Sequence, residues 1–227
     1  MRIIMNKNHE RLLLQIQNTM EQMQKLGYVL YYNVPKNEET EQNLTITWNN
    51  HRGGREVSSK YFLSIEQYLK ILSDNAFLAM LNDYSLIRCS FAFKDKKLIS
   101  ENLLWWPCPV KVDSNMVDEF GLIETIQLLL SDIANKEYIR MRSPIRVDFD
   151  IFNDTEVHPK AHMHIESEEC RINTNEPICF NRFINYIVKS FYPNWNMDFK
   201  EYDYLKLQYN NSRETKEYCN KTRVVFE

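Results

Sequence analysis

Residues 148–172 of the chain concentrate side chains that bind metal ions and transfer protons. The stretch is DFDIFNDTEVHPKAHMHIESEECRI. Carboxylates and imidazoles are ligands for hard and borderline divalent ions, and imidazole also exchanges protons near neutral pH. Either a metal site or a site of acid and base chemistry fits this composition. The candidate catalytic residues are Asp148, Asp150, His158, His162 and Arg171.

The hydrophobic pattern of this region predicts two strands that each carry their polar groups on one face. In PIRVDFDIF, apolar residues alternate with Arg146, Asp148 and Asp150, and in HMHIE they alternate with His162 and His164. Successive side chains of a strand point to opposite sides of the sheet, so the aspartates share a face, and so do the histidines. If the two strands pair across residues 153–161, carboxylates and imidazoles meet on one face.

This arrangement predicts a divalent metal site of Asp148, Asp150 and His162, with Mg²⁺, Mn²⁺ or Zn²⁺ as the ion. His158, beside Pro159, could swing over the same face, and Arg171 could hold an anionic group such as phosphate. The remaining candidate binding residues, which include a basic approach to the strand, are Arg146, His164, Arg142 and Arg140. The alternative is an ordinary solvent-facing sheet surface, where such side chains only pair across strands.

The elements that would position this site can be predicted along the chain. Residues 6–26 form an amphipathic helix that ends at Gly27, and Ser64 with Gln67 makes a capping box before a second, short helix. Apolar periodicity predicts two more helices, at residues 117–133 and 180–191. The predicted strands are YVLYYNV and NLTITW, separated by the polar connection PKNEETEQ, and a long hairpin of YSLIRCSFAF and KLISENLLWW.

These elements predict one α+β domain over residues 1–227, with a mostly antiparallel sheet packed by three to four amphipathic helices. The helix at 6–26 comes first, the sheet and its helices occupy 28–192, and 193–227 form a C-terminal extension. The extension has mixed periodicity, so neither strand nor helix is predicted for residues 195–227. No composition shift or internal repeat divides the chain.

Composition limits the function classes. The formal net charge is −3, so binding of RNA or DNA would need a local basic patch. No apolar run is long enough for a membrane helix, so we expect a cytoplasmic protein with no membrane partner. The five cysteines are scattered without a Cys-x-x-Cys pair, which argues against a disulfide framework or a structural zinc site.

Two further segments have alternative interpretations. The tryptophans of WWPCPV could stack on nucleic-acid bases, although large aromatic residues at a strand end more often close a core. The loop NNHRGGRE, with His51, Arg52 and Arg55, could cradle an anion, although a plain hairpin loop is the favoured interpretation.

Several short motifs resemble the prokaryotic domain of unknown function 2290. They are LLWWPCPV, IRVDFD, HPKAHMHI, CRI, Pro177 and FNRFINYIVKSFYP. The resemblance covers about 12–193, and the chain departs from it at Asn173 and Thr174. This family has no established activity, so the resemblance implies none. It does imply that the gene lies near mobile-element and phage-defence genes. The positions that match the motif are Arg146, Asp148, Asp150, His158, Pro159, His162, Cys170 and Arg171.

Three hypotheses follow. The first is a nucleic-acid-directed hydrolase, or RNase-like effector, in which the aspartates and histidines hold a metal or transfer protons and Arg146 and Arg171 hold phosphate. The second is a non-catalytic partner or scaffold of a multi-protein defence complex. Its expected surface is a set of exposed aromatic residues, Trp105, Trp106, Tyr192 and Trp195. The third, a nucleotide or small-ligand sensor at the NNHRGGRE loop, lacks a glycine-rich phosphate motif.

Overall fold

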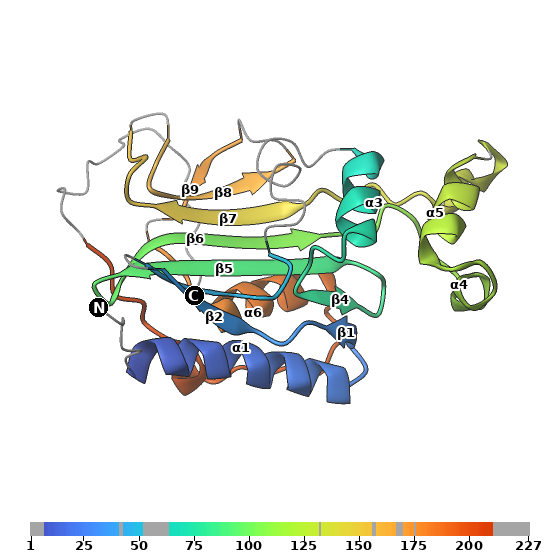
Figure 1. Cartoon of the computed structure of the whole chain (residues 1–227). Coiled ribbons are helices and arrows are strands. Elements are labelled where there is room, and N and C mark those ends of the chain that lie inside the picture. The colour runs from blue at the N-terminus through green and yellow to red at the C-terminus, as the bar shows by residue number, and fades with distance from the viewer. Residues whose placement is uncertain are drawn as a thin grey trace.

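A computed structural model describes residues 7–40, 43–51, 64–131, 133–155, 158–166, 170–174 and 176–210. Within these ranges, nine strands form one antiparallel sheet (Figure 1). Its main path runs β1-β4-β5-β6-β7-β8-β9, and β3 joins β2 to β5. The strands are β1 (Val29–Tyr32), β2 (Lys36–Glu39), β3 (Leu44–Thr47), β4 (Ala79–Leu81), β5 (Leu86–Lys94), β6 (Lys97–Trp106), β7 (Ile145–Asp150), β8 (Ala161–Ile165) and β9 (Ile172–Asn173).

The centre of the sheet is the predicted hairpin of β5 and β6. Its strands pair from Leu86 opposite Trp106 to Lys94 opposite Lys97. The turn residues Asp95 and Lys96 both have positive φ, of 49° and 68°, which suits the twist of a tight hairpin. Strand β6 then pairs with β7, so the hairpin holds the first strand of the candidate site in place.

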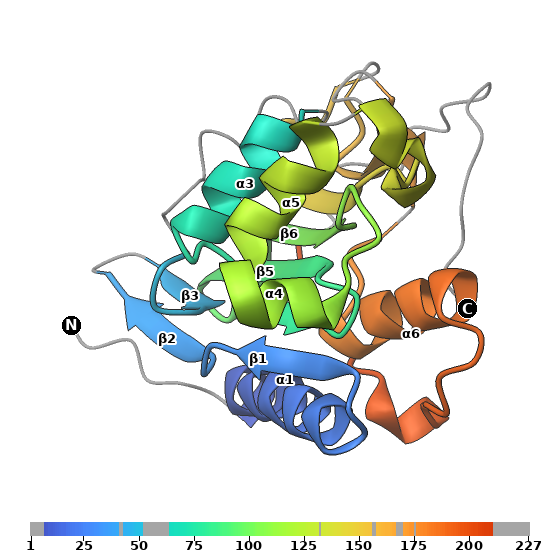
Figure 2. The same ribbon diagram turned by 90° about the vertical axis from the view of Figure 1, so that its right-hand side faces the viewer.

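The helices cover the two faces of the sheet unequally (Figures 1 and 2). One face packs against α1 (Lys7–Lys25) and α6 (Phe180–Phe191), which contribute Ile16, Met20 and Phe183 to a large apolar core. On the other face, α3 (Ile65–Ser73) and α5 (Leu122–Ser131) enclose a smaller core around Trp106. The rest of this second face carries polar side chains, and the candidate site lies there.

The described residues form the predicted α+β domain, with two differences in detail. The helix predicted at 117–133 is divided into α4 (Ser114–Phe120) and α5, because Gly121 between them has φ 84° and ψ 159°. This is a conformation that glycine adopts without strain and that no helix can continue through. The polar connection PKNEETEQ contains strand β2, whose charged side chains gave no alternating signal.

The aromatic residues expected at a partner surface are mostly internal, so that expectation is wrong. Trp105 and Trp106 point to opposite faces of the sheet, and each is buried in one of the two cores. Tyr192 is buried too, and Trp195 is half-buried between Tyr28 and Tyr192, at ring centroid distances of 4.4 and 4.0 Å. The interpretation of WWPCPV as a core-closing segment is confirmed.

The described part of the C-terminal extension, up to residue 210, is largely irregular. It contains one 3₁₀ turn, Glu201–Asp203, and Tyr209 bridges to Leu98. Phe199, Leu205 and Tyr209 nevertheless pack against the main core. Residues 211–227 and the arginines of the NNHRGGRE loop lie outside the described residues. Among the helices of the described ranges, none is long and apolar enough to cross a membrane.

Candidate metal centre

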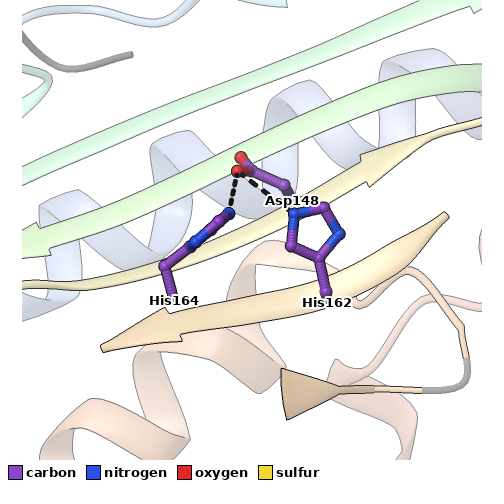
Figure 3. A group of neighbouring side chains, drawn as sticks. All are labelled: Asp148, His162 and His164. Carbon is purple, nitrogen blue, oxygen red and sulfur yellow. Dashed lines mark ion pairs between the residues drawn. The ribbon is translucent and has the colours of Figure 1, made fainter. Parts of the chain in front are cut away.

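Strands β7 and β8 pair in the antiparallel register that the site requires. Asp148 lies opposite His162, and Arg146 lies opposite His164. Val147 and Met163, the residues between them, are buried in the main core, so the polar residues share the other face. Figure 3 shows both imidazoles of β8 turned toward Asp148 of β7. One ligand atom from each of Asp148, His162 and His164 lies within 4.8 Å of the others.

The Asp148 carboxylate is the centre of the group. Its Oδ2 accepts a hydrogen bond from Arg146 Nε at 2.7 Å, and Oδ1 accepts one from Asn102 Nδ2 of β6 at 2.6 Å. His164 Nε2 lies 3.3 Å from Oδ2. Burial alone would raise the pKa of Asp148, but the hydrogen bond from His164 and the charge of Arg146 outweigh it and hold this pKa below its ordinary range. Asp148 is therefore a fixed anion.

His162 is held in one tautomer and kept neutral. Its Nδ1 lies 2.7 Å from the carbonyl oxygen of Pro159, and because a carbonyl only accepts, Nδ1 carries the proton. Burial lowers the pKa of His162 to about 4, so the ring is uncharged at neutral pH. Its Nε2 is then an unprotonated acceptor, and it lies 3.9 Å from Asp148 Oδ2, another acceptor. Among the described residues, Nε2 has no hydrogen-bond partner.

The register continues beyond the two central strands and lines up polar residues across the sheet. Asn102 of β6 lies opposite Asp148, and Asn173 of β9 lies opposite His162. Asn102 orients the carboxylate, yet it was not predicted as a site residue. The pairing of β6 with β7, separated by about forty residues of chain, is needed to place it, and the sequence shows no signal for that register.

Asp150 shares the face of Asp148 but organises the following loop instead of joining Asp148, His162 and His164. Its carboxylate accepts hydrogen bonds from Phe152 N at 2.8 Å and Asn153 Nδ2 at 2.5 Å. His164 takes its place in the group that could hold an ion. Of the predicted ligands, Asp148 and His162 thus lie together, with His164 as their neighbour in the position that was predicted for Asp150.

The loop built on Asp150 positions His158 at the border of the group. His158 N donates to Thr155 Oγ1, and its Nδ1 lies 3.0 Å from the carbonyl oxygen of Asn153. The His158 ring packs edge-on against His162, with 4.5 Å between ring centroids, and His162 packs in the same way against His164. The three imidazoles therefore form a continuous row from the partly exposed loop to the buried group.

The predicted basic approach is divided between two places. Arg146 belongs to the group through Asp148. Arg142 and Arg140, in contrast, pair with Asp83 in the turn before β5, with Nη1 to Oδ2 distances of 2.8 and 3.5 Å. Tyr192 also donates its hydroxyl to Asp83, at 3.2 Å. Arg140 and Arg142 are thus placed in a separate charge network, because the chain before β7 crosses toward the β4–β5 turn.

Fold and site together define an α+β protein whose antiparallel sheet carries a carboxylate and two imidazoles as a metal-capable group. The chain belongs to the family described as "Uncharacterized conserved protein (DUF2290)", which it matches over residues 28–224. The match includes every residue of the group and the motifs that resembled this family. No curated protein and no solved structure matches the chain.

Proposed function

We propose that the chain is a nucleic-acid-directed hydrolase, an RNase-like effector of a prokaryotic defence or toxin system in the cytoplasm. It uses one divalent metal ion held by Asp148, His162 and His164. The observation that carries the proposal is that two acceptors, the buried His162 Nε2 and Asp148 Oδ2, face each other at 3.9 Å without a proton between them. A cation between them would turn this repulsion into attraction.

The chemistry of the ligands fits a divalent ion. Neutral imidazoles and one carboxylate form the protein ligand set of many catalytic zinc and iron sites, which leave a position open for water or substrate. The hydrogen bond from His162 Nδ1 to a backbone carbonyl is the contact that orients metal-binding histidines in general. Arg146 and Asn102 give Asp148 the same support. When bound, such an ion supplies a Lewis acid and an activated water.

The remaining residues suit the hydrolysis of a phosphodiester. In that reaction water adds to phosphorus, the ester P–O bond breaks, the water gives up a proton and the leaving oxygen takes one. His158 is placed to carry a proton, because its Nδ1 is held by Asn153 and its ring lies against His162. Arg146 neutralises Asp148 and so allows an anionic substrate to approach.

One observation favours the second candidate, a non-catalytic partner module of a defence complex. The imidazoles of His162 and His164 are only 1% and 2% exposed, as expected of a structural network that orders the loop after β7. The two candidates differ in stability. A structural network predicts that His162→Ala costs about 1 to 3 kcal/mol of folding free energy without any effect on a reaction.

The test is a cleavage assay on single-stranded RNA and DNA with Mn²⁺, Mg²⁺ or Zn²⁺ added to metal-free protein. We expect cleavage that depends on the ion, is abolished by His162→Ala and Asp148→Ala, and persists in Asp83→Asn. The last variant is the matched control, because it alters an equally well-bonded carboxylate outside the group. Wild-type protein that cleaves neither substrate with any of the ions would contradict the proposal.

A further inference from the structure

We propose that Arg171 forms, next to the metal-binding group, a subsite for one phosphoryl group of an unpaired nucleic-acid strand. The inference rests on the proposed function, since it identifies how the same site would take its substrate. Arg171 lies next to the group in the sheet, its neighbours are buried, and it has no anionic partner among the described residues.

The register of the last two strands places Arg171 beside the group. His162 lies opposite Asn173 and Met163 opposite Ile172, so one further step brings Arg171 opposite His164. Ile172 packs against the main core, and alternation therefore puts Arg171 on the face of the two histidines. Neighbouring strands are about 5 Å apart, so the guanidinium of Arg171, the residue just before β9, is within reach of a group bound at His164.

Among the described residues, a carboxylate balances the charge of Arg146 but none balances that of Arg171. Arg146 donates to Asp148 at 2.7 Å, whereas no carboxylate of the described residues forms an ion pair with Arg171. The Nε atom of Arg171 is buried and, within the same described ranges, has no hydrogen-bond partner. A buried guanidinium donor without an acceptor is costly, and an anion supplied by a ligand would remove that cost. The planar fork of arginine matches two oxygens of a phosphate.

A phosphoryl group fits between Arg171 and the metal-binding group because it offers several oxygens in different directions. One oxygen can bind an ion held by Asp148, His162 and His164 while two others accept hydrogen bonds from the guanidinium. A carboxylate has only two oxygens, which lie in one plane, so it cannot bind the ion and also accept two hydrogen bonds from the guanidinium. The charges also agree: in the described part of the group, Asp148 is the single anion, and Arg146 already balances it.

Burial limits the kind of strand that can present the phosphate. His162 and His164 are almost fully buried, and the Asp148 side chain keeps 17% of its surface exposed. Among the described strands β9 is the last of the sheet, so Arg171 lies at an edge of this face. A duplex carries its phosphates on a wide, stiff helix, whereas an unpaired strand bends and can insert one phosphate. The substrate class is therefore a single-stranded nucleic acid that enters from the β9 edge.

The experiment is a calorimetric titration of the full chain with inorganic phosphate, in the presence and absence of Mn²⁺. Arg171→Gln removes the charge and Arg171→Lys keeps it without the fork. Arg11→Gln is the matched control, since Arg11 is an exposed arginine on α1, at the opposite face of the sheet. Thermal unfolding of each variant verifies that it is folded.

We expect Arg171→Gln to weaken phosphate binding about tenfold to a hundredfold, Arg171→Lys to weaken it less, and Arg11→Gln to leave it unchanged. Because one phosphate contacts both partners, Mn²⁺ should tighten phosphate binding, and phosphate should tighten Mn²⁺ binding by the same factor. An equal phosphate affinity of Arg171→Gln and the wild type, or no phosphate binding at all, would overturn the subsite.

Two outcomes distinguish a failure of the phosphate subsite from a failure of the proposed function. If Mn²⁺ binds and His162→Ala abolishes that binding while Arg171→Gln leaves phosphate affinity intact, the metal site stands and the phosphate subsite is wrong. If phosphate binding depends on Arg171 but no metal binds, the subsite stands and the metal hydrolase is wrong. A single-stranded oligonucleotide should compete with phosphate and the matching duplex should not; competition by the duplex alone would contradict the choice of an unpaired strand.

Discussion

Asp83, in the turn between β4 and β5, and Asp148, on β7, are two carboxylates with similar numbers of partners and different surroundings. Asp83 is held by Arg142 and Arg140, by the hydroxyl of Tyr192 and by Ser85 N at 3.0 Å. All of these partners are hydrogen-bond donors. Asp148 has three donors, Arg146, Asn102 and His164, but its fourth neighbour, His162, turns an unprotonated nitrogen toward it.

The difference shows what distinguishes a network that stabilises a fold from one that can do chemistry. The partners of Asp83 complete its hydrogen bonding, and arginine cannot give up its charge. At Asp148 the neutral ring of His162 presents a lone pair, so the interaction is incomplete until a cation arrives.

The largest effect is expected on metal affinity. His162→Ala and His164→Ala each remove one of three protein ligands, so we expect the affinity for Mn²⁺ or Zn²⁺ to fall on the order of a hundredfold or more. Isothermal calorimetry on metal-free protein measures it. Asp83→Asn should bind the ion like the wild type, and a similar loss in this variant would remove the contrast between the two carboxylates.

The second prediction concerns stability at the other carboxylate. Asp83→Asn leaves two partly buried guanidiniums without their anion, and we expect it to lower the free energy of unfolding by about 2 kcal/mol. Chemical denaturation measures this change. A loss within about 0.5 kcal/mol, the usual range of surface substitutions, would mean that the Asp83 network does not stabilise the fold.

The sequence could predict those parts of the two carboxylate sites that depend on residues close together in the chain. The alternation in residues 145–151 and 162–166 predicts that the aspartates share a face and that the histidines share a face, because strand parity is local; the pairing that brings Asp148 and His162 together was an assumption, which the register of β7 and β8 confirms. The sequence could not show that Arg142 would pair with Asp83 or that Asn102 would orient Asp148, since both contacts join segments far apart in the chain. Asp150 has the same parity as Asp148, so only the structure separates a loop-organising carboxylate from a ligand.

A third carboxylate, Glu101 of β6, differs from Asp83 and Asp148 because it has no cationic partner among the described residues. It is buried on the core face and accepts one hydrogen bond, from Ile178 N at 3.3 Å. Burial raises the pKa of Glu101 well above 4.5, despite the hydrogen bond from Ile178. Glu101 is therefore protonated in the folded protein under conditions where the unfolded chain is ionised.

This shift sets the sign of a pH effect. Above the unfolded pKa near 4.5 the folded state binds the extra proton, so stability falls as pH rises, by at most about 1.4 kcal/mol per pH unit. Glu101→Gln removes this dependence, and its advantage over the wild type should grow from pH 5 to pH 8. Denaturation curves across this range measure the effect, and parallel pH profiles for the two proteins would show that Glu101 is ionised in the fold.

The smallest effect is expected for a single hydroxyl. Tyr192 donates to Asp83 and accepts from Trp105 Nε1 at 3.2 Å, so Tyr192→Phe should lower the free energy of unfolding by about 1 kcal/mol. Metal affinity should not change. Double-mutant analysis with Asp83→Asn would show coupling, since both variants remove the same hydrogen bond, and additive losses would argue against a shared network.

Anomalous scattering from a crystal soaked in Mn²⁺ shows directly whether Asp148, His162 and His164 hold an ion. We predict one strong peak in contact with Asp148 Oδ2 and with Nε2 of His162 and His164, at ligand distances of about 2 Å. A peak held by Asp150 instead, or no peak at the three residues, would contradict the assignment of this group as the metal centre.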